Sequence, residues 1–237
     1  MLDGAAPGTR IAVVIPTLDE ERSIGACLES ARDADEIVVS DGGSADRTIE
    51  AARRYDPRVV VVEGPRGRGG QLNRGVAAAA APIVLFLHAD CLLPRGWPGA
   101  VRAALADPAV AVGCFRLRTE PPLVREASSA ERRWWRLLDL RSRGWGLPYG
   151  DQALFARRES VFGIGGFPEI PLMEDIAFVR AALRNGRLAR LPLEVRTTAR
   201  RFARHPIRAR VCTATFPALF RLGVSAETLA RWYGKGR

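Results

Sequence analysis

The sequence predicts an α/β fold in which a mostly parallel, Rossmann-like central sheet is flanked by helices, with a more helical C-terminal part. In the first half, short apolar runs of strand length alternate with amphipathic helical segments. Acidic residues directly follow three of these runs, and the second half is less regular and more helical. Strand–helix alternation of this kind favours parallel pairing with right-handed crossovers.

The first half supplies five expected strands, each short, apolar and rich in β-branched residues. We expect them at 11–15, 37–40, 59–62, 83–87 and 110–117. The helices between them are expected at 23–31, at 47–54 behind an Asp46 N-cap, at 71–80 and at 97–106.

The second half begins with a predicted helix at 124–142, which carries several arginines. A short strand is expected at 153–156, a helix at 174–185 ended by Gly186, a strand at 187–197 and mostly helical structure at 207–233. There is no internal repeat or low-complexity linker, so we predict one domain over residues 1–237.

The charge balance is strongly basic, with 36 Lys and Arg against 26 Asp and Glu and a pI near 10.7. Lys235 is the only lysine, so the positive charge reflects a compositional preference for arginine. No strand interleaves aromatic with basic residues as a single-strand nucleic-acid platform does, and we expect no nucleic-acid partner. The four cysteines form no Cys-x-x-Cys pair, which argues against a zinc site or a disulfide framework.

The longest apolar stretch, residues 76–93, is interrupted by Pro82, His88 and Asp90 and is not expected to span a membrane. The N-terminus lacks the basic and then apolar pattern of a signal peptide. We therefore expect a cytoplasmic protein.

The acidic strand ends are the most informative feature of the chain. Asp19 and Glu20 follow the first strand, Asp41 the second and Asp90 the fourth. In an open α/β sheet, ligands bind just beyond the carboxyl ends of the strands. An unpaired carboxylate beside an apolar sheet is costly, so these residues predict a pocket for a nucleotide and a metal.

Two further segments could contact phosphate. The glycine-rich stretch 64–75 opens a helix but has neither the P-loop ending nor the position of a Rossmann fingerprint, and a flexible turn is the alternative. His88-Ala89-Asp90 is a degenerate Asp-x-Asp element, a type that presents Mg²⁺ or Mn²⁺ to a diphosphate. Asp90 is the better ligand. For His88 three roles are open: a second metal ligand, a residue that supports a ligand, or a polar residue that only lines the site.

Two charged pairs lie in the second half. Glu174-Asp175 follows a glycine-rich loop at a helix start, and it either compensates the helix dipole or supplies a general base. Arg200-Arg201 follows a predicted strand and could bind a diphosphate bidentately, or could be two solvated charges.

The order of these elements resembles that of family 2 glycosyltransferases, which have the GT-A fold. The resemblance rests on Pro16-Thr-Leu-Asp-Glu20, Asp41-Gly-Gly-Ser-Ala-Asp46, the Gly67–Gly75 loop, His88-Ala-Asp90 and Met173-Glu-Asp175, and it extends from about residue 11 to 202. Tyr149-Gly-Asp-Gln152, Gly165-Gly-Phe-Pro168 and Thr198-Ala-Arg-Arg-Phe202 are similar to a short bacterial branch labelled radical-SAM/selenodomain-associated and linked to arsenosugar synthesis.

The resemblance implies a role for each matching residue. Pro16, Thr17, Glu20, Asp41, Arg68, Gln71, Asn73 and Ala89 would form the nucleotide pocket, Asp41 contacting uracil, and Arg200 and Arg201 would close over the diphosphate. Asp90, with His88, would hold Mn²⁺ or Mg²⁺; Asp175 would be the base; Asp151 and Glu174 would face the sugar or the acceptor. His88 stands where many relatives have an aspartate, which leaves one clear carboxylate ligand.

These implications predict an inverting, metal-assisted transfer of a sugar from a nucleotide sugar, UDP-linked, to a hydroxyl on a small-molecule or lipid-linked acceptor. Residues 1–118 would be the nucleotide-binding half and residues 119–237 the acceptor half. The alternatives are a nucleotidyltransferase that makes nucleotide sugars and a basic, non-catalytic module that binds RNA or a membrane surface. Peripheral contact with the inner membrane face is compatible with the transferase.

Overall fold

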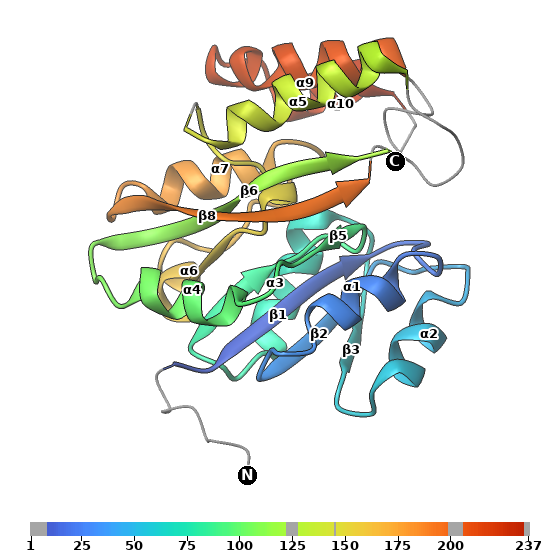
Figure 1. The fold of residues 1–237 in the computed structure, drawn as a ribbon, viewed down its shortest axis with the longest axis vertical. Coiled ribbons are helices and arrows are strands. Elements are labelled where there is room, and N and C mark those ends of the chain that lie inside the picture. Colours follow the sequence, from blue (N-terminus) through green and yellow to red (C-terminus); the bar gives the residue numbers. More distant parts are fainter. Residues whose placement is uncertain (1–8, 122–127, 145, 199–205, 235–237) are drawn as a thin grey trace.

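An eight-stranded sheet forms the centre of the computed structural model, in the order β3-β2-β1-β4-β7-β6-β8-β5 (Figure 1). This count and the description below concern residues 9–121, 128–144, 146–198 and 206–234, which the structure describes. The strands are β1 (Ile11–Thr17), β2 (Glu36–Asp41), β3 (Val60–Glu63), β4 (Ile83–Phe86), β5 (Cys91–Leu92), β6 (Val110–Glu120), β7 (Phe155–Arg157) and β8 (Arg187–Thr198).

The helices are α1 (Ile24–Ser30), α2 (Thr48–Tyr55), α3 (Arg68–Ala78), α4 (Trp97–Leu105), α5 (Ser129–Ser142), α6 (Arg158–Gly163), α7 (Glu174–Ala182), α9 (Pro206–Arg221) and α10 (Ala226–Tyr233). A short 3₁₀ turn, η2, spans Gly150–Gln152. None of the helices in the described ranges is long and apolar enough to cross a membrane.

The two halves of the sheet differ in strand direction. Strands β3, β2, β1 and β4 pair in parallel, as the strand–helix alternation predicts. Strand β7 then runs antiparallel to both of its neighbours, β4 and β6, and β5 runs antiparallel to β8. Strands β6 and β8 pair in parallel, so the sheet is mostly parallel as predicted. The antiparallel placement of β7 and β5 was not predicted, because local sequence patterns identify a strand but do not specify its neighbour.

Helices cover both faces of the sheet. Ile11, Val13 and Ile15 of β1 pack in one core cluster with α1 and α4, and Ala12 and Val14 pack in another with α3 and α7. Successive side chains of a strand point to opposite faces, so a strand buried on both faces needs the continuous apolar run seen here. A smaller cluster, Leu172, Cys212, Phe216 and Leu229, joins α9 and α10 to the loop before α7.

Several element boundaries differ from those predicted. Helix α3 begins at Arg68, three residues before the predicted start, so part of the glycine-rich segment is helical. Helix α5 begins at Ser129, because Ser128 and Glu131 form a capping box there. Asp46 accepts a bond from Thr48 N at 2.9 Å, although the N-cap position is Arg47. The two-residue β5 and the short α6 were not predicted.

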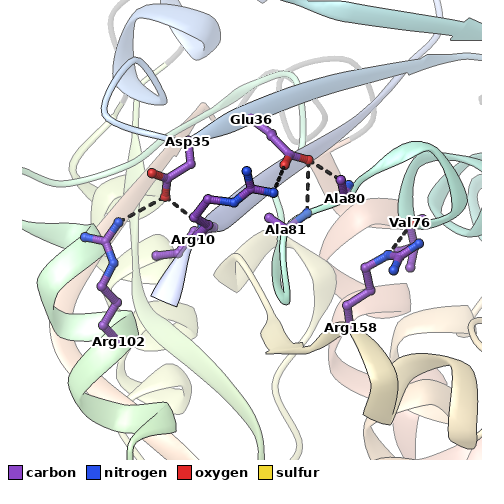
Figure 2. A network of polar contacts seen from close by, with 9 residues as sticks. Arg10, Asp35, Glu36, Val76, Ala80, Ala81, Arg102 and Arg158 are labelled. Carbon is purple, nitrogen blue, oxygen red and sulfur yellow. Dashed lines mark hydrogen bonds and ion pairs between the residues drawn. The ribbon is translucent and has the colours of Figure 1, made fainter. Parts of the chain in front are cut away.

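Charged residues at the amino ends of the strands serve the fold. Asp35 accepts hydrogen bonds from Ile11 N and Arg102, and Glu36 accepts from Arg10 and from the backbone of Ala80 and Ala81 (Figure 2). These bonds tie together the starts of β1 and β2, the end of α3 and helix α4. At the opposite edge of the sheet, Asp90, Glu174 and Asp175 instead line a cavity.

Candidate functional site

A cavity of about 130 Å³ lies at the carboxyl edge of the sheet. Its charged lining residues and one histidine come from five segments of the chain: Arg68, His88, Asp90, Arg141, Asp151, Glu174 and Asp175. Its apolar lining comes largely from β6, the loop before α7, α9 and α10 and includes Leu117, Leu172, Phe216, Pro217 and Tyr233. The structure thus brings the predicted metal, base and acceptor-side residues into one cavity.

Asp175 lies in the first turn of α7, with both carboxylate oxygens held by backbone donors. Gly150 N donates to Oδ2 at 2.7 Å, and Ile176 N donates to Oδ1 at 2.7 Å. Burial and the neighbouring negative charge of Glu174 raise the pKa of Asp175 to about 6, against the opposing effects of the Gly150 hydrogen bond and of Arg68. A carboxylate with such a pKa is suited to accept a proton near neutral pH.

Glu174 is fully buried and forms an ion pair with Arg68. The Arg68 Nη1 atom donates to Glu174 Oε1 at 2.8 Å. Burial opposes the charge on Arg68, but Glu174 and Asp175 outweigh it and raise the pKa of the guanidinium. This pair joins the start of α3 to the start of α7, and removing Arg68 would leave the buried charge of Glu174 uncompensated.

Gly150 connects the base with the histidine. Its N–H donates to Asp175, and a Cβ atom placed on it would lie 2.8 Å from His88 Nε2 and 3.4 Å from Asp175 Oδ2. Real Cβ atoms do not approach other atoms as closely as the first of these distances. Glycine at this position therefore lets the imidazole and the carboxylate face the same peptide unit.

We expect Gly150→Ala to lower activity about 10²-fold, because displacing His88 or Asp175 by about 1 Å misplaces reacting groups. Steady-state transfer assays with a circular dichroism check of folding would measure it. Gly99→Ala on α4 is the matched control, since a Cβ there has nothing within 4 Å. Equal activities of the two variants would contradict this role for Gly150.

The residues present fit a divalent cation. Ligand atoms of His88, Asp90 and Cys91 lie within 4.8 Å of one another. Burial and the charge of Asp90 raise the pKa of the Cys91 thiol well above its ordinary value. Its sulfur is also a soft donor, which suits Mn²⁺ and Mg²⁺ poorly. Asp90 and His88 remain, an oxygen and a nitrogen donor that suit Mn²⁺ and are also compatible with Mg²⁺.

The predicted nucleotide residues Asp41 and Gln71 are used within the fold. Asp41 is fully buried and accepts hydrogen bonds from Thr17 Oγ1, Ser44 Oγ and the backbone N–H groups of Gly43 and Ser44. Burial opposes ionisation of Asp41, but these bonds prevail and lower its pKa. Gln71 Nε2 donates to Thr17 O and Ser40 O, so the amide joins the carboxyl ends of β1 and β2.

Asn73 is likewise engaged by the protein. Its Nδ2 donates to Phe167 O at 2.8 Å, and its Oδ1 accepts from Phe167 N at 2.8 Å. These reciprocal bonds fix the loop after α6 to helix α3. The sequence suggested a nucleotide contact at Asn73 and did not predict this link.

We expect Asn73→Ala to lower the free energy of unfolding by about 2 kcal/mol, from two lost hydrogen bonds of about 1 kcal/mol each. Urea denaturation of the variant against wild type would measure the change. Asn185→Ala, at an exposed position after α7, is the control and should leave the midpoint unchanged. A midpoint for Asn73→Ala equal to that of the control would show that the link contributes nothing.

The remaining predicted residues lie around or outside the cavity. Pro16 and Thr17 are the last residues of β1, and Ala89 is buried. The Glu20 carboxylate accepts a hydrogen bond from Ser23 Oγ at 2.6 Å. None of these four predicted residues lines the cavity. Arg200 and Arg201 lie outside the described residues. The sequence did not identify Arg141 or the residues of α9 and α10 as part of the cavity, because no motif contains them. Gly150, in contrast, lies within the Tyr149–Gln152 segment that the resemblance includes.

Three comparisons with known proteins all find glycosyltransferases. The model of the family described as glycosyl transferase family 2 matches residues 12–164. A glucosyl-3-phosphoglycerate synthase from Mycolicibacterium paratuberculosis is 36% identical over 106 residues, which cover 40% of this chain and 32% of that protein. The chain thus matches only about a third of the length of that curated relative.

Two solved structures are similar over most of the chain. A mannosyltransferase from Pyrobaculum calidifontis, in complex with GDP-Man and Mn²⁺, has a TM-score of 0.68 and 25% identity, covering 95% of this chain and 70% of the other. A glucosyl-3-phosphoglycerate synthase from Mycobacterium tuberculosis, with Mn²⁺, UDP and glucosyl-3-phosphoglycerate, has a TM-score of 0.54 and 25% identity, covering 79% and 71%.

These likenesses confirm the predicted GT-A fold class. The family match covers the parallel half of the sheet, the His88–Asp90 element and the Gly150 turn, well over half of the 237 residues. The chain therefore belongs to glycosyl transferase family 2.

Proposed function

We propose that this protein is a metal-assisted glycosyltransferase that moves a sugar from a nucleotide sugar, UDP-linked, to a hydroxyl-bearing acceptor. The observation that carries the proposal is the position of Asp175, in one cavity with Asp90, His88 and the Arg68–Glu174 pair. The two similar enzymes named above, which were solved with Mn²⁺ and either GDP-Man or UDP, support the donor class.

In this proposal Asp175 accepts the proton of the acceptor hydroxyl as its oxygen attacks the anomeric carbon. The bond from that carbon to the diphosphate oxygen breaks on the opposite face, so the configuration inverts. Asp90 and His88 would hold the cation, which supplies positive charge to the departing diphosphate. Arg200 and Arg201 are proposed to add to that charge, and Asp151 and Glu174 to face the sugar or acceptor.

Thr17, Asp41 and Gln71 are proposed to shape the nucleotide pocket through the bonds that join β1, β2 and α3. This assigns residues 1–118 to donor binding and 119–237 to the acceptor within one domain. A nucleotidyltransferase is disfavoured, because such enzymes carry a basic glycine-rich loop after the first strand, where this chain has Pro16–Glu20.

Calorimetric titration with UDP, GDP and ADP, each with and without Mn²⁺, would test the donor proposal. We expect Mn²⁺-dependent binding of UDP in preference to the other two. Binding of GDP instead would change the donor base but keep the enzyme class. Failure of every nucleotide to bind would refute the proposed function and favour the non-catalytic binding module.

The raised pKa of Asp175 predicts a pH dependence. Because the base acts in its deprotonated form, transfer should fall as pH drops below about 6, approaching tenfold per pH unit well below the pKa of the carboxyl. Rates measured at saturating donor between pH 4.5 and 8 would show this limb. A rate independent of pH across this range would argue against Asp175 as the base.

Two finer assignments belong to this proposal. The Tyr149–Gln152 and Gly165–Pro168 segments favour the arsenosugar-linked branch of the family. Exposed Leu137 and Leu140 lie among arginines on α5, which is compatible with peripheral membrane contact and a lipid-linked acceptor. Co-sedimentation with anionic liposomes at low and moderate salt would test this contact, and no binding at either would refute it.

A further inference from the structure

Arg141, on α5, lines the same cavity but differs from Arg68 in its contacts. Arg68 is paired with Glu174 at 2.8 Å. Among the described residues no carboxylate pairs with Arg141, and its Nε, although buried, has no hydrogen-bond acceptor. A guanidinium that lines a cavity without a carboxylate partner can bind an anion supplied by a ligand, through charge-assisted hydrogen bonds.

The guanidinium of Arg141 is held by an aromatic ring. Its Cζ atom lies 3.5 Å from the ring centroid of Tyr149. This cation–π contact uses the face of the planar group and leaves the N–H donors along its edge for other partners. Arg141 is therefore positioned without an acidic partner, in the geometry that suits bidentate binding of a carboxylate or phosphate.

The position of Arg141 relates it to the base. Tyr149 is adjacent in sequence to Gly150, whose N–H donates to Asp175 Oδ2 at 2.7 Å. An anion bound at Arg141 would thus lie near Tyr149, the residue before the peptide that holds the base. The cavity lining also includes Leu172, Phe216 and Pro217, which present no charge to an acceptor.

We propose that Arg141 binds an anionic group, a phosphate or carboxylate, carried by the acceptor, so that the acceptor is an anionic hydroxyl compound. This deepens the proposed function and rests on it. The alternative source of the same chemistry is the donor diphosphate. If Arg141 binds the donor diphosphate, its substitution should weaken nucleotide binding. If Arg141 binds the acceptor, its substitution should leave nucleotide affinity unchanged.

The test compares wild type with Arg141→Gln and Arg141→Lys. Arg136→Gln is the matched control, because Arg136 is exposed on the same helix and does not line the cavity. Calorimetry would measure UDP binding with Mn²⁺, and then binding of 3-phosphoglycerate, glycerate and glycerol with and without UDP. Thermal unfolding would verify that each variant is folded.

We expect wild type to bind 3-phosphoglycerate or glycerate in preference to glycerol. Arg141→Gln should weaken anion binding at least about tenfold, or about 1.4 kcal/mol, with partial recovery in Arg141→Lys and no change in Arg136→Gln. UDP affinity should be the same in all four proteins.

A parallel loss of UDP affinity in Arg141→Gln would overturn the inference and assign Arg141 to the donor. Equal binding of glycerol and the anions by wild type would also overturn it, and this arm does not depend on any variant folding. Failure of wild type to bind UDP, GDP or ADP would instead refute the proposed function, so the two failures are distinguishable.

Discussion

Asp175→Asn is expected to lower the rate of transfer by about 10²-fold or more, while UDP binds with unchanged affinity. The asparagine keeps the size of the side chain and one oxygen for the Gly150 or Ile176 N–H, but it cannot accept the proton of the hydroxyl. Single-turnover transfer and calorimetry with UDP and Mn²⁺ would measure the two quantities separately.

Asp33→Asn, at an exposed position after α1, is the control for this substitution and should be fully active. The acid limb of the pH profile should also disappear from the residual activity of Asp175→Asn. Turnover near that of wild type would remove Asp175 from the mechanism. A product with the anomeric configuration of the donor would contradict inversion even if the variant were inactive.

Asp90→Ala is expected to abolish the Mn²⁺-dependent part of UDP binding, a loss of about 10²-fold in affinity at saturating metal. Asp90 is the carboxylate of the His88, Asp90 and Cys91 group, and in wild type removal of metal with EDTA should have the same effect. Calorimetry with UDP at fixed Mn²⁺ would measure the loss, with Asp33→Ala as the control. Mn²⁺-dependent binding that survives in Asp90→Ala would refute a metal site at this residue.

The histidine can be examined in the same experiment. His88→Asp restores an Asp-x-Asp element and should improve binding of UDP with Mg²⁺ relative to Mn²⁺, because hard cations prefer oxygen ligands. His88→Ala should weaken binding with Mn²⁺ if the imidazole is a ligand. An affinity unchanged in both variants would assign His88 to the wall of the cavity instead.

Much of the fold could be predicted from sequence, because it depends on local patterns. The five strands expected in the first half occur with boundaries shifted by at most three residues, and α4 begins at Trp97 as expected. Predictions were weaker where a short element has little pattern of its own. Strand β5 has two residues and exists only because Cys91 and Leu92 pair with β8.

Within the site, the sequence identified residue types suited to the chemistry but not their partners. Asp90, Glu174 and Asp175 were recognised from acidic residues at strand and helix ends, and all three line the cavity. Asn73 was assigned to the nucleotide, yet it bonds the backbone of Phe167, 94 residues away. No local pattern could reveal that link.

The sequence by itself thus determined which segments become strands and helices, and that acidic residues follow the strands, because periodicity and β-branched content act over a few residues. The tertiary structure alone decided that β7 lies antiparallel between β4 and β6, that Gly150 holds Asp175, and that Arg141 stacks on Tyr149 in the cavity. These contacts join segments that only packing of the whole chain brings together, and their free energies depend on burial that no short stretch of sequence can provide.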